Sequence, residues 1–191
     1  MDFPDLHKFD VAAVDTETTG LKWWEDKIFG ISASTPDGKD YYWDTRETPK
    51  VLQWLADQVA HPDCPLLVNH NMKFDLHMLR EAGVDINPRA VECTMIRAAL
   101  IDENLREYNL DFVARKYLGT GKVSDIYEKL AELFGGKPTR QAQMKHLHRA
   151  PVSLTAPYAK RDTRAALDLW YWQEKEIKRQ GLEQIMAFEK R

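Results

Sequence analysis

The sequence predicts a single α/β domain built on a mixed sheet. Short strand-like runs fill the first part of the chain and alternate with helical patterns, and only helical patterns follow position 93. Strands interleaved with helices, and then helices alone, are typical of this fold class. The chain has 191 residues, 43% of them hydrophobic, which is enough for one sizeable core. Neither an internal repeat nor a low-complexity linker divides it, so we expect one domain over residues 1–191.

Short apolar or alternating runs predict the strands at 11–14, 28–33, 40–43, 65–68 and 91–93. The run at 11–14 is fully apolar, which is typical of a buried central strand. Pro36, Asp37 and Gly38 separate the second and third runs and favour a turn. A mixed sheet with flanking helices follows from this order.

Apolar residues three or four apart predict helices at 49–61, 72–82, 110–117, 126–133 and 156–180. Thr48 is the expected cap of the first helix, with Pro49 at its first position. Thr155 is the expected cap of the last helix, with Pro157 in the first turn, where a missing N–H costs little. A glycine follows each of the three middle helices, as is common after a helix end.

Charge and cysteine content restrict the class of protein. The formal net charge of −3 argues against binding nucleic acid by bulk electrostatics, but not against an acidic site neutralised by metal. Cys64 and Cys93 are far apart without a CxxC spacing, so a zinc site or disulfide scaffold is not expected. The N-terminus has no signal-like pattern, and no run reaches membrane-spanning length. We expect a soluble cytoplasmic protein with no membrane partner.

Asp15 and Glu17 follow the first predicted strand. Residues two apart in extended backbone share a face, so both carboxylates should point the same way. Two acids this close repel each other unless a cation neutralises them. The alternative interpretation is a solvated turn at the strand end.

Two further pairs stand at helical spacing. Asn71 and Asp75 are one turn apart, as are Tyr158 and Asp162, so each pair shares a helix edge. Taken alone, Asp75 is equally well explained as a solvated first-turn acid. Taken alone, Tyr158 and Asp162 are better explained as a packed tyrosine above a surface ion pair. Together the three sites supply the oxygen ligands that Mg²⁺ and Mn²⁺ prefer, and two such ions can clamp a phosphodiester.

The segments VDTETTGL, NMKFD and YAKRD resemble the three motifs of the tyrosine branch of the DEDD exonuclease superfamily. The resemblance is to the 3′–5′ proofreading exonuclease domain of family A DNA polymerases from phages and bacteria. It covers about residues 10–180 and is supported by CTMIRAAL and NLDFVARKYLG between the motifs. It implies a ribonuclease H-like fold and hydrolysis of single-stranded DNA from its 3′ end, releasing nucleoside 5′-monophosphates.

The resemblance also implies the roles of individual residues. Asp15, Glu17 and Asp162 would hold the first of two divalent cations, Mg²⁺ or Mn²⁺. Asp15 would be shared with the second ion, which Asp75 would support through water, and Tyr158 would orient the attacking water. Three more residues, in the positions that contact the terminal nucleotide in the family, are Thr18, Leu21 and Asn71.

Other functions remain open at this point. A ribonuclease D-like enzyme would use the same chemistry on RNA, and a silent scaffold would only bind nucleic acid or a polymerase. The polymerase part is absent from this chain, so we expect a proofreading domain that works with a covalently or non-covalently associated polymerase. Its expected location is the cytosol of a bacterium or a phage-infected host.

Several residues around the motifs have two interpretations. Lys137, Arg140, Lys145 and Arg149 form a basic stretch that could contact phosphates, although a solvated face is the favoured interpretation for any one of them. His146 and His148 lie within it and are not counted as metal ligands. Trp23 and Trp24 could stack on a base, but at least one is expected to pack on the domain. The three aromatic residues at 170–172 are expected in the core.

Overall fold

A five-stranded mixed sheet forms the centre of the protein. The computed structural model describes residues 3–120 and 125–189. The strands are β1 Val11–Thr18, β2 Ile28–Ser34, β3 Asp40–Asp44, β4 Leu66–Asn69 and β5 Val91–Cys93. Their order is β3-β2-β1-β4-β5, with β1–β2 and β2–β3 antiparallel and β1–β4 and β4–β5 parallel. The predicted α/β fold with a mixed sheet is confirmed.

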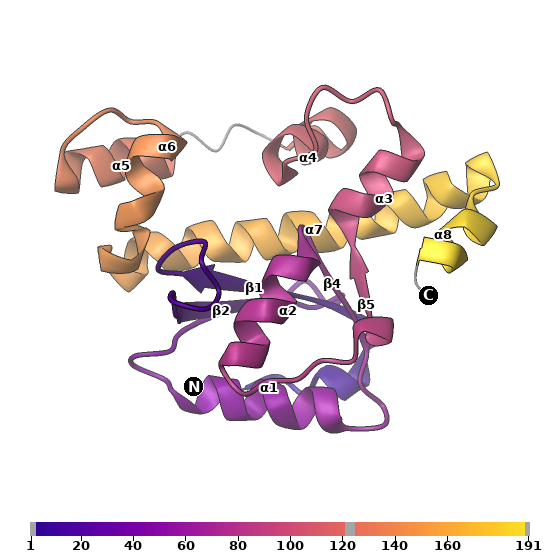
Figure 1. The fold of residues 1–191 in the computed structure, drawn as a ribbon, viewed down its shortest axis with the longest axis horizontal. Helices are drawn as coiled ribbons and strands as arrows, with labels where there is room; N and C mark the ends of the chain where they lie inside the picture. The colour runs from indigo at the N-terminus through magenta and orange to yellow at the C-terminus, as the bar shows by residue number, and fades with distance from the viewer. Residues whose placement is uncertain (1–2, 121–124, 190–191) are drawn as a thin grey trace.

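Helices cover both faces of the sheet (Figure 1). The α-helices are α1 Lys50–Ala60, α2 Met72–Glu81, α3 Thr94–Ile101, α4 Leu110–Leu118, α5 Asp125–Phe134, α6 Arg140–Gln143, α7 Val152–Gln180 and α8 Glu183–Glu189. Short 3-10 helices are η1 Leu6–Lys8, η2 Pro88–Ala90 and η3 Met144–Arg149. Among the described residues, no helix is both long and apolar enough to cross a membrane.

The alternation of side chains along β1 divides the core into two layers. Ala12 and Val14 pack with residues of α1 and α2 on one face. Val11 and Ala13 pack with Leu167 of α7 on the other face. Because successive strand residues point to opposite faces, Asp15 and Glu17 continue the row toward α7. The prediction that these two residues share a face is therefore consistent with the packing.

Strand β1 is longer than predicted. It continues to Thr18, so Asp15 and Glu17 lie within the strand and not after its end. The apolar run stops at Val14, but β2 goes on pairing with β1: Asp15 is opposite Ser32 and Glu17 opposite Gly30. Backbone pairing with a neighbouring strand thus extends β1 past its apolar residues.

Both predicted threonine caps are wrong. Helix α1 begins at Lys50 after Pro49, with no side-chain cap. Helix α7 begins at Val152 and runs without a break to Gln180, so Thr155 and Pro157 both lie inside it. Burial of Thr155, Tyr158 and Ala159 against the domain outweighs the helix bond that Pro157 cannot make.

The aromatic cluster on α7 is only partly in the core. Trp170 and Trp172 are partly buried, whereas Tyr171 is 40% exposed. Consecutive helix residues are about 100° apart around the axis, so three in a row cannot all face one core. The prediction is therefore wrong for Tyr171.

Candidate active site

An open cleft of about 920 Å³ lies at the edge of the sheet where β1 and β4 run toward their C-terminal ends. Four of the five predicted catalytic residues line it: Asp15, Glu17, Tyr158 and Asp162. The three predicted substrate-binding residues, Thr18, Leu21 and Asn71, line it as well. Segments from the start, middle and end of the chain therefore meet at one place.

Asp75 lies behind this cleft and is only 3% exposed. Its Oδ1 accepts hydrogen bonds from the Thr16 amide at 3.1 Å and from Thr16 Oγ1 at 2.6 Å. Its Oδ2 accepts from Asn69 Nδ2 at 2.8 Å. A solvated first-turn acid is thus excluded, and Asp75 is a buried, fully bonded carboxylate.

Asn69 connects two of the acids. Its Nδ2 also donates to Asp15 Oδ1 at 2.7 Å, so one amide group holds Asp15 and Asp75 together. Neither Asn69 nor Thr16 was predicted as a site residue. The sequence did contain one signal for Asn69: it is a polar residue that directly follows the apolar run at 66–68. That run forms β4, which pairs in parallel with β1.

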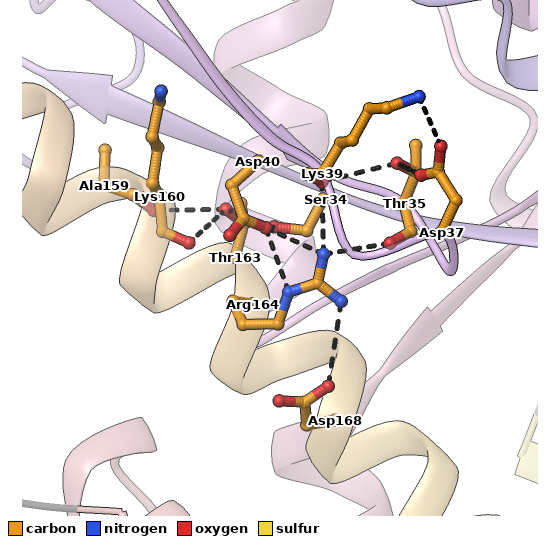
Figure 2. A network of polar contacts seen from close by, with 10 residues as sticks. All are labelled: Ser34, Thr35, Asp37, Lys39, Asp40, Ala159, Lys160, Thr163, Arg164 and Asp168. Atoms are coloured by element: carbon orange, nitrogen blue, oxygen red, sulfur yellow. Dashed lines mark hydrogen bonds and ion pairs between the residues drawn. The ribbon is translucent and has the colours of Figure 1, made fainter.

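The end of β2, the turn after it and the first residue of β3 hold helix α7 in place (Figure 2). Arg164 donates to Asp40 Oδ1 at 2.9 Å and to the carbonyls of Thr35 at 2.9 Å and Lys39 at 3.1 Å. Ser34 Oγ lies 3.0 Å from Thr163 Oγ1. Because Thr163 and Arg164 directly follow Asp162, these contacts fix the position of Asp162 along the sheet.

Arg161 contacts both α7 residues of the site. It donates to Asp162 Oδ1 at 2.9 Å, and its guanidinium carbon lies 5.3 Å from the centre of the Tyr158 ring. Tyr158 itself is only 8% exposed. The prediction that Tyr158 and Asp162 share one side of a helix is consistent with this arrangement, since a single arginine reaches both.

Burial raises the pKa values of all four acids, and repulsion between the acids adds to this for Asp15 and Glu17. Burial raises the pKa of Asp15 well above its usual range, and the charge of Asp75 adds to this effect. Burial likewise raises the pKa of Glu17, and the charge of Asp15 adds. Burial raises the pKa of Asp75 to about 7 despite its hydrogen bonds from Thr16. Burial also raises the pKa of Asp162. Without a nearby cation, the charged form of each of the four carboxyl groups is therefore disfavoured.

The oxygen atoms of these acids are the ligands that a hard divalent cation prefers, although some of the side chains form other hydrogen bonds or ion pairs in this structure. Within residues 3–120 and 125–189, no three acidic, histidine or cysteine side chains are already arranged around one ion position. Asp162 is paired with Arg161 and Asp75 with Thr16 and Asn69. All the acids offer oxygen, and a cation would stabilise the charged carboxylates, which burial disfavours, and relieve the repulsion at Asp15 and Glu17. Metal binding would thus compete with the Asp162–Arg161 ion pair.

The basic stretch contributes two of its four charged residues to the cleft. Arg140 and Lys145 are among its lining residues, and Lys137 and Arg149 are not. Arg149 instead lies over the Phe134 ring at 5.1 Å, and His146 stacks on the same ring. Arg140 and Lys145 are both exposed, as the solvated-face interpretation expects, and their position also leaves them open to the cleft.

Comparison with known proteins identifies the family of the chain. The family described as 3′–5′ exonuclease matches residues 3–178. The chain is 49% identical over its whole length to DNA polymerase DpoZ of Acinetobacter phage SH-Ab 15497, and 52% identical over 99% of its length to DpoZ of Salmonella phage PMBT28. It spans only 30% of the length of each of these two polymerases.

The fold recurs in solved structures. Brucella melitensis NrnC with bound Mg²⁺ has a TM-score of 0.63 at 23% sequence identity, covering 93% of this chain and 78% of that one. At this identity the likeness concerns the fold alone, which is ribonuclease H-like. With the family match and the polymerase relatives, the result is clear: the chain belongs to the 3′–5′ exonuclease family and resembles the exonuclease part of family A DNA polymerases.

Proposed function

We propose that the chain hydrolyses the last phosphodiester bond at the 3′ end of single-stranded DNA and releases nucleoside 5′-monophosphates. The observation that carries this proposal is the meeting of Asp15, Glu17, Tyr158 and Asp162 in one cleft. Its substrate-binding residues would be Thr18, Leu21 and Asn71, which line the same cleft. Because the relatives are DNA polymerases, the activity would serve proofreading beside a polymerase domain in the cytosol.

The acids would hold two divalent cations, Mg²⁺ or Mn²⁺. Asp15, Glu17 and Asp162 would bind one ion, and Asp15 would be shared with the second, which Asp75 would support through water. Two ions about 4 Å apart stabilise the attacking and leaving oxygens of an in-line displacement. The NrnC structure contains Mg²⁺, which supports this choice of ion.

Tyr158 would orient the attacking water. Burial raises the pKa of its hydroxyl well above the usual range, and the charge of Asp162 adds to this effect. The hydroxyl therefore keeps its proton and can hydrogen-bond a water without becoming charged. Asn69 and Thr16 would be positioning residues that do not bind the ions themselves: Asn69 holds the carboxylate of Asp15, and Thr16 holds that of Asp75.

The walls of the cleft would bind the substrate strand. Leu21 is 82% exposed at the rim, where an apolar side chain can press against the last base. Arg140 and Lys145 would bind phosphates, which gives a chain of net charge −3 a local basic contact for the strand. Asn71 has a left-handed backbone (φ 67°) and lies exposed before α2, where its side chain is free to reach a nucleotide.

A 5′-labelled oligonucleotide incubated with Mg²⁺ or Mn²⁺ tests the proposal. We expect a ladder of shortened DNA and little degradation of RNA. Asp15→Ala should abolish cleavage, and Tyr158→Phe should slow it while leaving metal affinity largely unchanged. Asp10→Ala, an exposed acid before the same strand, is the matched control and should behave as the parent. Cleavage of RNA alone, or near-normal cleavage by Asp15→Ala, would overturn the assignment.

A further inference from the structure

The loop between β1 and β2 displays a large aromatic side chain beside the cleft. Trp24 is 58% exposed, and Leu21 on the same loop is 82% exposed. Gly20 and Leu21 line the cleft, whereas Trp24, three residues later, is not among its lining residues. The tryptophan therefore lies outside the cleft on a loop whose first part forms the cleft rim.

Hydrogen bonds close this loop on itself. The Thr19 amide donates to the carbonyl of Lys27 at 3.0 Å. The carboxylate of Asp26 accepts from Thr19 Oγ1 at 2.9 Å and from the Lys22 amide at 2.8 Å. A Cβ at Gly20 would lie only 2.5 Å from Asp26 Oδ2, so glycine is needed there for the carboxylate to approach. The loop is thus a fixed structure that carries Trp24 in one place.

The two adjacent tryptophans have different surroundings. Trp23 stacks on His77 of α2, with ring centres 5.0 Å apart and planes 18° apart, which anchors the loop to the domain. Trp24 meets Trp23 at 85°, with centres 5.3 Å apart, and keeps more than half of its surface exposed. Aromatic packing therefore explains Trp23 and fixes the orientation of Trp24, but it leaves much of the Trp24 ring uncovered.

We propose that Trp24 is a stacking platform for a nucleobase of the bound single strand, behind the terminal nucleotide. This inference rests on the proposed function of the cleft. A strand with its last nucleotide against Leu21 must leave the cleft over its rim, and Trp24 is the exposed aromatic residue of the rim loop. Bases of every type stack on tryptophan, so the platform would hold the strand without selecting a sequence.

Binding experiments in EDTA test the proposal without cleavage. With a 5′-fluorescein oligo(dT), Trp24→Ala should weaken binding ~5-fold or more, and Trp24→Phe should retain most of the affinity. Tyr171→Ala, which removes an exposed aromatic residue of α7, is the matched control and should bind as the parent. An abasic site at one position behind the 3′ end should weaken the parent similarly and should not weaken Trp24→Ala further.

Kinetics with Mg²⁺ supply an independent measurement. Trp24→Ala should raise KM for long oligonucleotides with little change in kcat, and it should leave a dinucleotide substrate unaffected. If the parent binds and cleaves DNA but Trp24→Ala matches it in every assay, the platform is refuted and the proposed function stands. If the parent neither binds nor cleaves DNA, the proposed function fails and this inference fails with it.

Discussion

Removing the guanidinium of Arg164 tests how α7 is held over the sheet. Arg164→Met keeps most of the apolar length of the side chain but deletes its hydrogen bonds to the carbonyls of Thr35 and Lys39 and to Asp40, the first residue of β3. Asp40 keeps its contact with Ser34, and Thr163 remains near Ser34. The variant should therefore fold, with α7 less firmly positioned beside Asp162.

The size of the effect follows from these contacts. A hydrogen bond from a charged donor contributes about 1.5–3 kcal/mol. The side chain of Arg164 is 24% exposed and that of Asp40 is 30% exposed, so water replaces part of each interaction. We expect Arg164→Met to lower the free energy of unfolding by about 2–4 kcal/mol. A small displacement of Asp162 should also lower kcat by on the order of tenfold.

Urea denaturation followed by circular dichroism measures the first effect, and initial rates on labelled DNA measure the second. Arg164→Lys should recover part of both, because an ammonium can still pair with Asp40. Arg179→Met is the matched control: Arg179 lies on the same helix and pairs with Glu176, but its side chain is 70% exposed, so we expect a loss below about 0.5 kcal/mol. An equally small loss in Arg164→Met, or a stability loss with unchanged kcat, would refute this reasoning.

Three further predictions concern the acids and their neighbours. In EDTA, the free energy of unfolding should rise as the pH falls from 8 to about 6.5. The pKa of Asp75 is about 7 in the folded protein and 3.8 ordinarily, so the folded protein takes up a proton there that the unfolded chain does not. The stability gained from this proton is lost as the pH rises through 7. Below pH 6.5, His70 costs stability as the pH falls, since burial lowers its pKa to about 4; this offsets the gain from Asp75, so the rise should level off. Urea titrations with and without Mg²⁺ measure both pH ranges, and Mg²⁺ should remove the rise. Gly30→Ala should cost about 1–3 kcal/mol in thermal denaturation, because its Cβ would lie 2.5 Å from the hydroxyl of Tyr42; an unchanged Tm would contradict this. Asn69→Ala should weaken Mg²⁺ binding about tenfold by calorimetry, and equal affinity would show that its amide does not organise the carboxylates.

Local spacing predicted much of the fold and part of the site. The two-residue period of a strand placed Asp15 and Glu17 on one face, and the four-residue spacing of a helix placed Tyr158 and Asp162 on one side. These rules need only neighbours in the chain. The meeting of the two pairs in one cleft was expected from the resemblance to a family and not from spacing.

The remaining features depend on contacts between distant segments. Nothing local shows that Asp75 is buried behind the cleft, because its burial depends on Thr16 and Asn69 of two strands. The start of α7 was misplaced for a related reason: tertiary packing carried the helix through Pro157. Periodicity indicates which face of an element is buried, but not which partner covers it.

The contact between Ser34 and Thr163 joins residues 129 positions apart. Strand β1, which carries Asp15 and Glu17, precedes α7 in the chain, and the long-range contacts that dock α7 can form only after that segment has been made. Tyr158 and Asp162 join the acids of β1 only when α7 docks. On the proposed function, newly made protein would therefore lack nuclease activity until its last long helix is in place.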